Sequence, residues 1–406
     1  MFMLQYLEDS PELDRLDLQA VLEKLRRALD CLPLRSVLIG WRLPPGWLEA
    51  CRQVCQQAGV RLLRWHPLLT GDGVFMPRPQ WQTLGLDGAP IAGFGGMAEF
   101  TFVCPNHPEA AQASLRHVEE ICAAGVYDGL FLDRIRFPSP AADPLRHLGC
   151  FCPHCVRRAA QEGLDLQEVQ QHLRRMTETP QGRVELVGGL LAPAVSNSPQ
   201  TQALEALIAF RQRSVADFVA RAARLAKDSA MEVGLDCFSP ALTRMVGQDL
   251  TALGGCADWI KIMSYAHTLG PAGLPFELLG LLDALTGGAD LPQTDALQLL
   301  ARALGFALPP DRRTLQNAGL APQALAEEVR RGVRAAAVPV LAGIELVEIA
   351  AVAHLDETGI AADVRAVRQA GAAGVVISWD LLHIPLRRLE ILRRVWLEDS
   401  SAEREL

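Results

Sequence analysis

The stretch Val126-Tyr-Asp-Gly-Leu-Phe-Leu-Asp-Arg-Ile-Arg-Phe-Pro138 reads as a short buried strand that ends abruptly in charge. Residues 129–132 are apolar or small, and the charged residues Asp133, Arg134 and Arg136 follow them. A carboxylate at the end of an apolar strand is costly unless it is paired or has a function. In a parallel α/β barrel, the carboxyl ends of the strands carry the chemistry. We therefore expect this strand to belong to such a barrel, with Asp133 at its functional end.

Seven further apolar runs can be arranged around this strand. Most are followed by a helical pattern, and they are continuously apolar, as parallel strands buried on both faces are. The expected strands cover residues 36–41, 60–66, 100–104, 129–132, 232–238, 258–265, 338–345 and 374–379. Eight strands alternating with helices predict an α/β fold, a (β/α)8 TIM barrel.

The 406 residues suit one barrel domain over 1–406 that contains a long zinc-bearing insertion at 138–200, after the fourth strand. The alternative architecture is a doubly wound open sheet, which usually carries a glycine-rich phosphate turn after its first strand. Residues 41–46 lack such a turn, so the barrel is favoured.

Composition excludes several classes of partner. The net charge is −8 and no basic stripe appears, so we expect no nucleic acid partner. No apolar run reaches about 18 residues, which predicts no membrane span. The N-terminal residues lack a basic region followed by an apolar run, so we expect no export signal and a cytoplasmic protein. Ten cysteines in such a chain indicate reduced thiols or a metal site.

Three of these cysteines lie within six residues, in the motif Cys150-Phe-Cys-Pro-His-Cys155. Cys104 ends the expected strand 100–104, and neighbouring barrel strands would bring it beside this motif. Cys104, Cys150, Cys152 and Cys155 are thus predicted to bind one structural, tetrahedral Zn²⁺. Ordinary free thiols, or His154 as a substitute ligand, are the alternatives. The other six cysteines lie in helical or strand patterns and are expected to be buried fillers: Cys31, Cys51, Cys55, Cys122, Cys237 and Cys256.

Ionisable side chains recur near the carboxyl ends of five expected strands. Alternate residues of a barrel strand point inward. In each of these five strands, the ionisable residue lies on the same face of the strand as small, apolar or polar neighbours. Five strands with this feature predict a polar pocket at the barrel mouth. The positions are Arg64 with His66, Asp133, Asp236, Lys261 with Tyr265, and Glu345.

Two carboxylates on either side of an acetal bond are the minimal equipment for glycoside hydrolysis. We assign the ionised carboxylate to Asp133. Glu345 is the first choice for the acid/base because its strand lies across the barrel, and Asp236 is the second. Lys261 could face Asp133 and keep it charged, or it could form a salt bridge with Asp236. The expected substrate is a small glycoside or oligosaccharide.

Six further residues at strand ends are candidates for contact with a sugar, although packing or solvation explains most of them equally well. They are His66, Arg136, Lys261, Tyr265, Trp379 and Asp380. A carbohydrate-binding or regulatory barrel without catalysis is the main rival function. A metal-dependent hydrolase would need His and Asp ligands converging on an open metal site, and the sequence has neither an H-x-H on its first strand nor an H-E-x-x-H motif.

The strand-four stretch also carries a resemblance. Residues 127–138 resemble the D-G-I-x-L-D-Y-I-R-F-P signature of glycoside-hydrolase-like barrel proteins, and residues 102–109 resemble the segment that those proteins carry after strand three. Separately, the four cysteines are similar in order and placement to the zinc-binding cysteines of family 42 β-galactosidases. This resemblance implies a structural zinc at Cys104, Cys150, Cys152 and Cys155.

The resemblance to family 42 stops at strand four. Those enzymes carry an Asn-Glu pair there, with the Glu as acid/base, whereas this chain has Asp133-Arg134. Their strand-four acid cannot be carried over, and β-galactosidase activity is not implied. Glu345 matches the position of the strand-seven nucleophile in that broad clan, so the roles of Asp133 and Glu345 could be exchanged.

Overall fold

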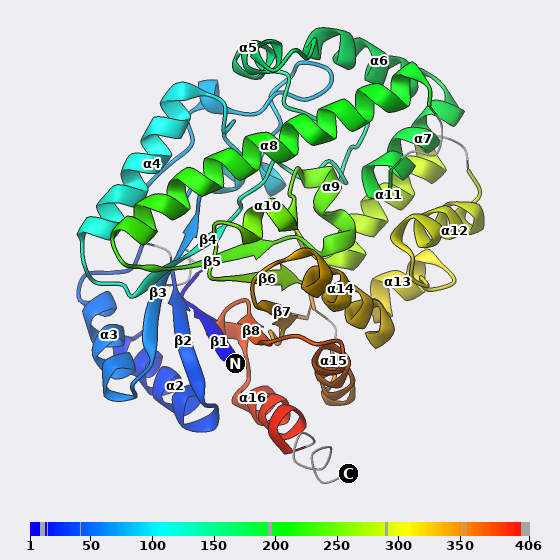
Figure 1. Ribbon diagram of the computed structural model, residues 1–406. Coiled ribbons are helices and arrows are strands. Elements are labelled where there is room, and N and C mark those ends of the chain that lie inside the picture. The colour runs from blue at the N-terminus through cyan, green and yellow to red at the C-terminus, as the bar shows by residue number, and fades with distance from the viewer. Residues whose placement is uncertain are drawn as a thin grey trace.

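The chain closes into a barrel of eight parallel strands that follow one another in sequence order (Figure 1). The computed structural model describes residues 1–8, 13, 15–40, 42–193, 197–288, 291–350, 352, 353 and 355–398. The barrel is closed because β1 pairs with both β2 and β8. The strands are β1 (Phe2–Tyr6), β2 (Leu34–Ile39), β3 (Arg61–Pro67), β4 (Gly129–Asp133), β5 (Glu232–Cys237), β6 (Trp259–Met263), β7 (Val340–Glu345) and β8 (Gly374–Ser378).

One helix follows each strand and covers the outside of the barrel, and additional helices extend the connections after β4, β5 and β6 (Figure 1). The covering helices are α2 (Leu18–Cys31), α3 (Trp47–Gln57), α4 (Pro108–Ala123), α8 (Pro199–Asp228), α10 (Leu250–Gly254), α14 (Pro322–Ala335), α15 (Glu357–Gln369) and α16 (Leu386–Arg393). The additional helices are α5 (Pro153–Gln161), α6 (Leu166–Glu178), α7 (Pro180–Leu191), α9 (Thr243–Val246), α11 (Leu274–Gly288), α12 (Gln293–Leu304) and α13 (Arg312–Ala318).

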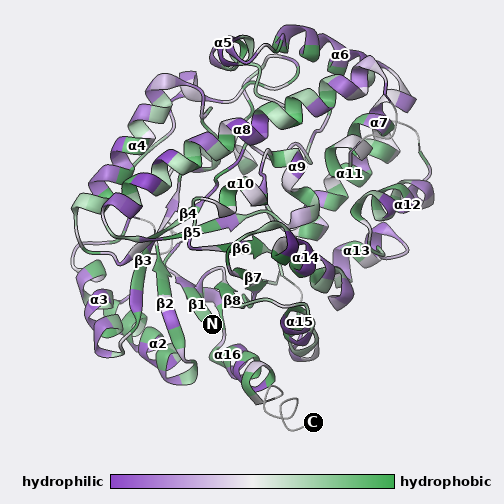
Figure 2. Cartoon of the chain, in the orientation of Figure 1, coloured by the Kyte–Doolittle hydropathy of each residue, from purple (hydrophilic) through white to green (hydrophobic). Residues whose placement is uncertain are grey.

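The sequence sets many of these helix starts directly. Several helices have proline in their first turn, where its missing N–H costs no hydrogen bond. Among them are α4, α5, α7, α8 and α14. Others begin after an aspartate whose carboxylate accepts from the free N–H groups of the first turn, as Asp165 does for α6 and Asp356 for α15. Helices such as α4 and α8 alternate between hydrophilic and hydrophobic residues, as expected for helices that cover a barrel (Figure 2).

The structure differs from the sequence prediction at two strands. The strand expected at 100–104 is part of the long connection between β3 and α4, where Val103 makes only an isolated antiparallel bridge with Gln82. The true first strand is β1, which is fully buried and was not predicted. One expected strand is a loop and one strand was not expected, so the total stays at eight. The strand expected at 129–132 is therefore still the fourth strand of the barrel, β4.

The other expected strands agree in place with the structure. The strand expected at 36–41 begins at Leu34, and Trp41 lies outside the described residues. The insertion at 138–200 contains α5, α6 and α7, and α6 packs along the long helix α8. Within the described ranges, no helix combines the length and hydropathy needed to cross a membrane.

The lower part of the barrel interior is a packed apolar floor. The rings of Phe131 and Trp259 stack with centroids 5.3 Å apart. Gly234 on β5 makes room for the indole, because a Cβ at this position would lie 2.1 Å from Trp259 Cζ2. The polar groups described next therefore lie above a closed floor, at the carboxyl ends of the strands.

Candidate functional site

A cavity of about 480 Å³ opens at the carboxyl ends of the strands. Its lining includes the carboxyl groups of Glu8, Asp133, Asp236 and Asp380. Aromatic rings from several loops and strand ends line the rest: Trp65, Phe94, Phe100, Tyr265 and Trp379. The rim is apolar and open to solvent, since Phe94 is 45% exposed. The cavity thus combines a few polar groups with a mostly apolar wall, as small-molecule sites do.

Asp133, the last residue of β4, is held in a fixed orientation. Its Oδ2 accepts a hydrogen bond from Trp65 Nε1 at 3.0 Å, and its Oδ1 accepts from the backbone N–H of Arg134. The Arg134 guanidinium turns away, lies 3.9 Å from the centroid of the Phe100 ring, and donates to Thr70 Oγ1 and the Glu99 carbonyl. Asp133 therefore lines the cavity without a direct salt bridge to its neighbour in sequence.

Asp236 and Lys261 form the centre of a buried network. Lys261 Nζ donates to Asp236 Oδ2 at 2.8 Å, Gln5 Oε1 at 2.8 Å and Tyr265 Oη at 2.7 Å. The sequence left open whether Lys261 faces Asp133 or forms a salt bridge with Asp236. In the structure, Lys261 forms the salt bridge with Asp236. The other oxygen of Asp236, Oδ1, has no hydrogen-bond partner in the part of the chain that the structure describes.

The environment of Asp236 makes it a weak acid. Burial raises its pKa to about 7, the attraction of Lys261 opposes this shift, and the negative charge of Asp133 adds to it. A carboxyl group with a pKa near neutrality can both donate and accept a proton at physiological pH. Asp236 therefore combines a salt bridge to Lys261 with a place in the cavity wall.

Glu8 is a further acidic group of the cavity that the sequence did not reveal, and Glu99 also lines the cavity. Glu8 directly follows β1, the unpredicted strand, and both of its carboxylate oxygens accept from Gln5 Nε2, at 2.8 and 3.0 Å. Burial raises its pKa well above the usual range. Asp380 fixes this segment, because its two oxygens accept from the backbone N–H groups of Leu7 and Glu8. The signal that could have found Glu8 is an apolar run at residues 2–7 ending in an acid, as in β4.

Glu345 ends β7 but does not line the cavity. Its Oε1 accepts from the backbone N–H of His267 at 2.6 Å, and the residue is 1% exposed. Burial raises the pKa of its carboxyl group to about 7. The connection after β6 therefore covers the side chain that the sequence favoured as acid/base, and leaves Asp133 and Asp236 as the predicted catalytic residues that line the cavity.

The inward register expected for Arg64 and His66 is wrong. β3 pairs with β4 so that Trp65 is level with Phe131 and Pro67 with Asp133, which places Trp65 on the interior face. His66 lies on the other face and contacts His117 of α4, with ring centroids 5.2 Å apart. Because neighbouring strand residues point to opposite faces, a one-residue error exchanges the interior and exterior sets.

The other predicted sugar contacts stand at or beside the cavity. Tyr265 and Trp379 both line it, with ring centroids 6.1 Å apart. Arg136 also lines it, and its guanidinium lies between the rings of Phe102 and Phe238, 4.6 and 4.3 Å from their centroids. Lys261 is fully buried below the cavity, so it acts on the site through Asp236 and Tyr265.

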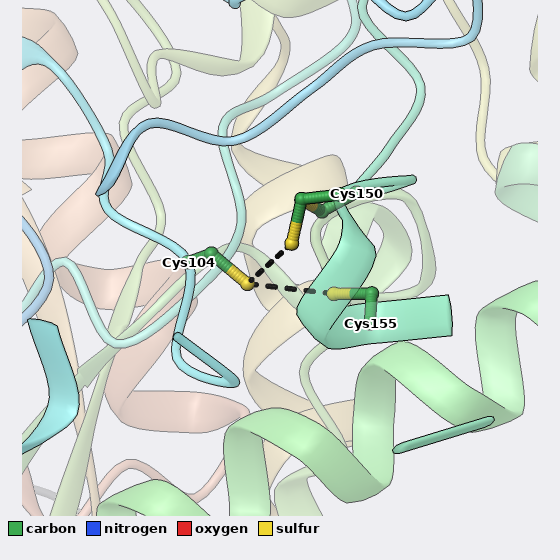
Figure 3. A group of neighbouring side chains, drawn as sticks. Cys104, Cys150 and Cys155 are labelled. Carbon is green, nitrogen blue, oxygen red and sulfur yellow. Dashed lines mark hydrogen bonds between the residues drawn. The ribbon is translucent and has the colours of Figure 1, made fainter. Parts of the chain in front are cut away.

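The four predicted cysteine ligands converge, although Cys104 reaches the cluster from a loop and not from a strand. Their sulfur atoms lie within 4.8 Å of one another, and all four side chains are buried. Cys104 Sγ lies 3.4 Å from Cys155 Sγ and 3.6 Å from Cys152 Sγ. Figure 3 shows Cys104, Cys150 and Cys155 pointing toward one another, with Cys155 on α5. These four residues form a group that can hold a metal ion.

Neighbouring residues orient this cysteine cluster. Asn106 donates to Cys155 Sγ at 3.3 Å, and the neighbouring His107 is the N-cap of α4. His154 packs against His107, with centroids 4.0 Å apart, and is not among the converging ligands. Of the six other cysteines, three are buried as expected and three are half-buried: Cys51, Cys55 and Cys237, then Cys31, Cys122 and Cys256.

No family model matches the chain, but solved structures share its fold at low sequence identity. The glycoside hydrolase domain of PgaB (BpsB) from Bordetella bronchiseptica is 14% identical with a TM-score of 0.53, over 99% of this chain and 97% of that domain. A β-galactosidase from Marinomonas ef1 is 12% identical with a TM-score of 0.59, over 100% of this chain and 60% of that one. The barrel is one that glycoside hydrolases use. An α-L-fucosidase from Paenibacillus thiaminolyticus matches at 12% identity and a TM-score of 0.53, over 99% of this chain and 49% of that one.

Proposed function

We propose that this protein is a glycoside hydrolase that cleaves its substrate with Asp133 and Asp236. The observation that carries the proposal is that these two carboxyl groups, from the neighbouring strands β4 and β5, line one aromatic-walled cavity at the carboxyl pole of the barrel. The likeness to glycoside hydrolase barrels supports it.

Asp133 acts as the ionised carboxylate at the sugar. The hydrogen bonds from Trp65 Nε1 and the Arg134 N–H hold it in one orientation, which is what attack at a fixed carbon requires. Trp65, Tyr265 and Trp379 offer flat apolar surfaces to the faces of the sugar ring.

Asp236 carries the proton for the leaving group. Its Oδ1 has no partner among the described residues, whereas both oxygens of Glu8 are engaged by Gln5. A pKa of about 7 leaves a substantial fraction of Asp236 protonated at neutral pH. Lys261 and Gln5 act as positioning residues, since Lys261 donates to Asp236 and Gln5 donates to Glu8.

The placement of the two carboxyl groups on neighbouring strands is the basis for proposing retention of configuration. Leu132 is level with Leu235, so Asp133 and Asp236 are the next positions on two adjacent strands, whose backbones lie roughly 4.8 Å apart. Retaining glycosidases place their carboxyl groups about 5–5.5 Å apart, and inverting enzymes about 6.5–9.5 Å apart. We therefore propose that Asp133 is a nucleophile and that a glycosyl-enzyme intermediate forms.

A screen of aryl glycosides and oligosaccharides tests the proposed activity. We expect hydrolysis of at least one sugar, with the first product released in the anomeric configuration of the substrate, as nuclear magnetic resonance of the fresh product would record. Release of the opposite anomer would contradict the nucleophilic role of Asp133. Absence of hydrolysis across the screen would contradict the enzymatic assignment.

A non-catalytic carbohydrate-binding barrel is the second candidate, and the Lys261–Asp236 salt bridge favours it. A carboxylate held by a fully buried ammonium group can serve structure alone. This candidate predicts saturable sugar binding without release of reducing ends, so parallel calorimetry and reducing-end assays separate the two.

The pH dependence of kcat/KM should fall on the alkaline side. Because the free enzyme needs protonated Asp236, activity should be lost as the pH rises through its pKa of about 7, with a tenfold decrease per pH unit above it. The expected profile is measured between pH 5 and 9 with a substrate that has a poor leaving group. A profile flat from pH 6 to 9 would remove Asp236 from this role.

We further propose that the cysteine cluster holds a structural Zn²⁺. A tetrahedral ion with Zn–S bonds of about 2.3 Å places its sulfurs roughly 3.8 Å apart, close to the observed 3.4 and 3.6 Å contacts. Arg211 is fully buried nearby; burial lowers its pKa to about 9, and the charges of Cys150 and Cys155 act in the opposite direction. A zinc–thiolate centre would thus balance the Arg211 charge.

Loss of this ion should destabilise the fold. Cys152→Ser should remove one zinc per chain and lower the melting temperature, because a ligand at a thousandfold excess over its Kd stabilises the native state by about 4 kcal/mol. Cys122→Ser, a half-buried cysteine outside the cluster, is the matched control. Calorimetry and elemental analysis provide the readouts, and equal metal content in the two variants would exclude the site.

A further inference from the structure

Two histidines and an aspartate form a cluster outside the barrel, between β3 and α4, which the proposed hydrolysis does not use. His66 comes from β3, Asp72 from the loop that follows, and His117 from α4. One ligand atom from each lies within 4.8 Å of the others. The closest pair is His117 Nε2 and Asp72 Oδ2, at 2.8 Å.

His66 is the unexplained member of this cluster. It is 1% exposed, and neither ring nitrogen has a hydrogen-bond partner among the residues with described placement. The nearest acceptor is Asp72 Oδ2, 3.6 Å from Nδ1, which is longer than a hydrogen bond. Burying an imidazole without a partner is unfavourable, so such a group calls for a bound species or an unusual role.

The donor set identifies the species. Two imidazoles and one carboxylate are the ligands that Zn²⁺ and other first-row divalent cations take, and three protein ligands leave a coordination position open. We propose that His66, Asp72 and His117 bind a second divalent transition-metal ion, independent of the cysteine cluster and of glycoside hydrolysis. The ion would join the loop after β3 to α4.

The surroundings of Asp72 prepare it for this role and also limit its affinity. Its Oδ1 accepts from the backbone N–H groups of Val74 and Phe75, at 2.9 and 2.7 Å, which fixes the carboxylate with Oδ2 toward the histidines. Arg64 donates to the same Oδ2 at 2.9 Å. Because a cation would share this oxygen with a guanidinium, the site should bind metal more weakly than the four cysteines do.

Access to the site exists from the helical side. The His117 side chain is 12% exposed, whereas His66 and Asp72 are 1% and 0% exposed. An ion can therefore enter past His117, and the open position would face that route. The site should exchange its metal with solvent, unlike the closed cysteine cluster.

Metal counting with matched variants tests the proposal. The purified full chain is dialysed to equilibrium against millimolar ZnCl2, and the zinc bound per chain is measured as the excess over the dialysate. We expect two ions in the wild-type protein, and one in His117→Ala and in the milder His66→Asn. His172→Ala, a half-buried histidine on α6 outside the cluster, should keep two. Circular dichroism confirms that each variant is folded.

A second measurement does not depend on any variant. Crystals grown with ZnCl2 should show anomalous scattering at the zinc edge between His66, Asp72 and His117, as well as at the cysteines. Anomalous density at the cysteines alone, with a water molecule bound to His66, would overturn the proposal. So would one zinc per chain in the wild-type protein at millimolar ZnCl2, or two in every histidine variant.

Discussion

Asp133→Asn should reduce kcat/KM by roughly 10³-fold or more on any true substrate, which is a loss of about 4 kcal/mol of transition-state stabilisation. The reason is that an amide of the same shape keeps the hydrogen bond from the indole of Trp65 but cannot form the covalent bond to the sugar. The loss should be equal for substrates with good and poor leaving groups. Steady-state kinetics on a matched pair of aryl and alkyl glycosides measures it.

Glu345→Gln is the matched control for that variant. Glu345 also ends a barrel strand, but its carboxyl group accepts from the His267 N–H and lies outside the cavity lining. Glutamine keeps this acceptor, so kcat/KM should stay within about threefold of the wild type, under ~1 kcal/mol. A large loss in Glu345→Gln beside an active Asp133→Asn would mean that the roles are reversed.

Asp236→Asn should show a different pattern. Without the proton donor, a substrate with a poor leaving group should lose roughly 10²–10⁴-fold in rate, the range of general acid catalysis. A dinitrophenyl glycoside needs no protonation of its leaving group, so its kcat/KM should stay close to the wild-type value. Its kcat should still fall, because the same residue acts as general base when water hydrolyses the glycosyl-enzyme. The alkaline decrease of the pH profile should also disappear.

The folding of this variant must be checked, because Asp236 is the ion-pair partner of the buried Lys261. Removing one partner of a buried pair can cost about 3–5 kcal/mol of stability. Lys261 retains Gln5 and Tyr265 as hydrogen-bond partners, so we expect a folded protein with a lower melting temperature. In a folded variant, equal losses of kcat/KM on substrates with good and with poor leaving groups would mean that Asp236 has only a structural role.

The sequence predicted the barrel because its strands are continuous apolar runs, and it predicted Asp133 because the charge follows the run at once. It missed β1, whose five residues include Gln5 and Tyr6, and it therefore missed Glu8. Residues 100–104 were predicted as a strand because they form a short, mostly apolar run, but their backbone forms loop contacts with residues such as Gln82. The local sequence pattern cannot distinguish a barrel strand from such a loop segment, because pairing with distant segments decides whether a strand forms.

The details of the site depend on register and on distant segments. On β3, polar side chains occur on both faces, so the sequence did not show that Trp65 and not His66 points inward. Glu345 has the expected strand-end position, but the connection that leads to His267 covers it. The four cysteines converge as the sequence predicted, although Cys104 does so from a loop and not from a strand. Their convergence depends less on strand assignment than the other features do, because three of them lie within six residues.

The central claim is that Asp133 and Asp236 act on the same glycosidic bond within the cavity. The most direct test is a crystal structure of Asp133→Asn with a bound oligosaccharide identified by the screen. We predict a sugar ring against Trp379 and Tyr265, its anomeric carbon within contact distance of residue 133 and its glycosidic oxygen hydrogen-bonded to Asp236 Oδ1. An oligosaccharide bound elsewhere on the molecule, or one whose glycosidic oxygen faces away from Asp236, would contradict the account.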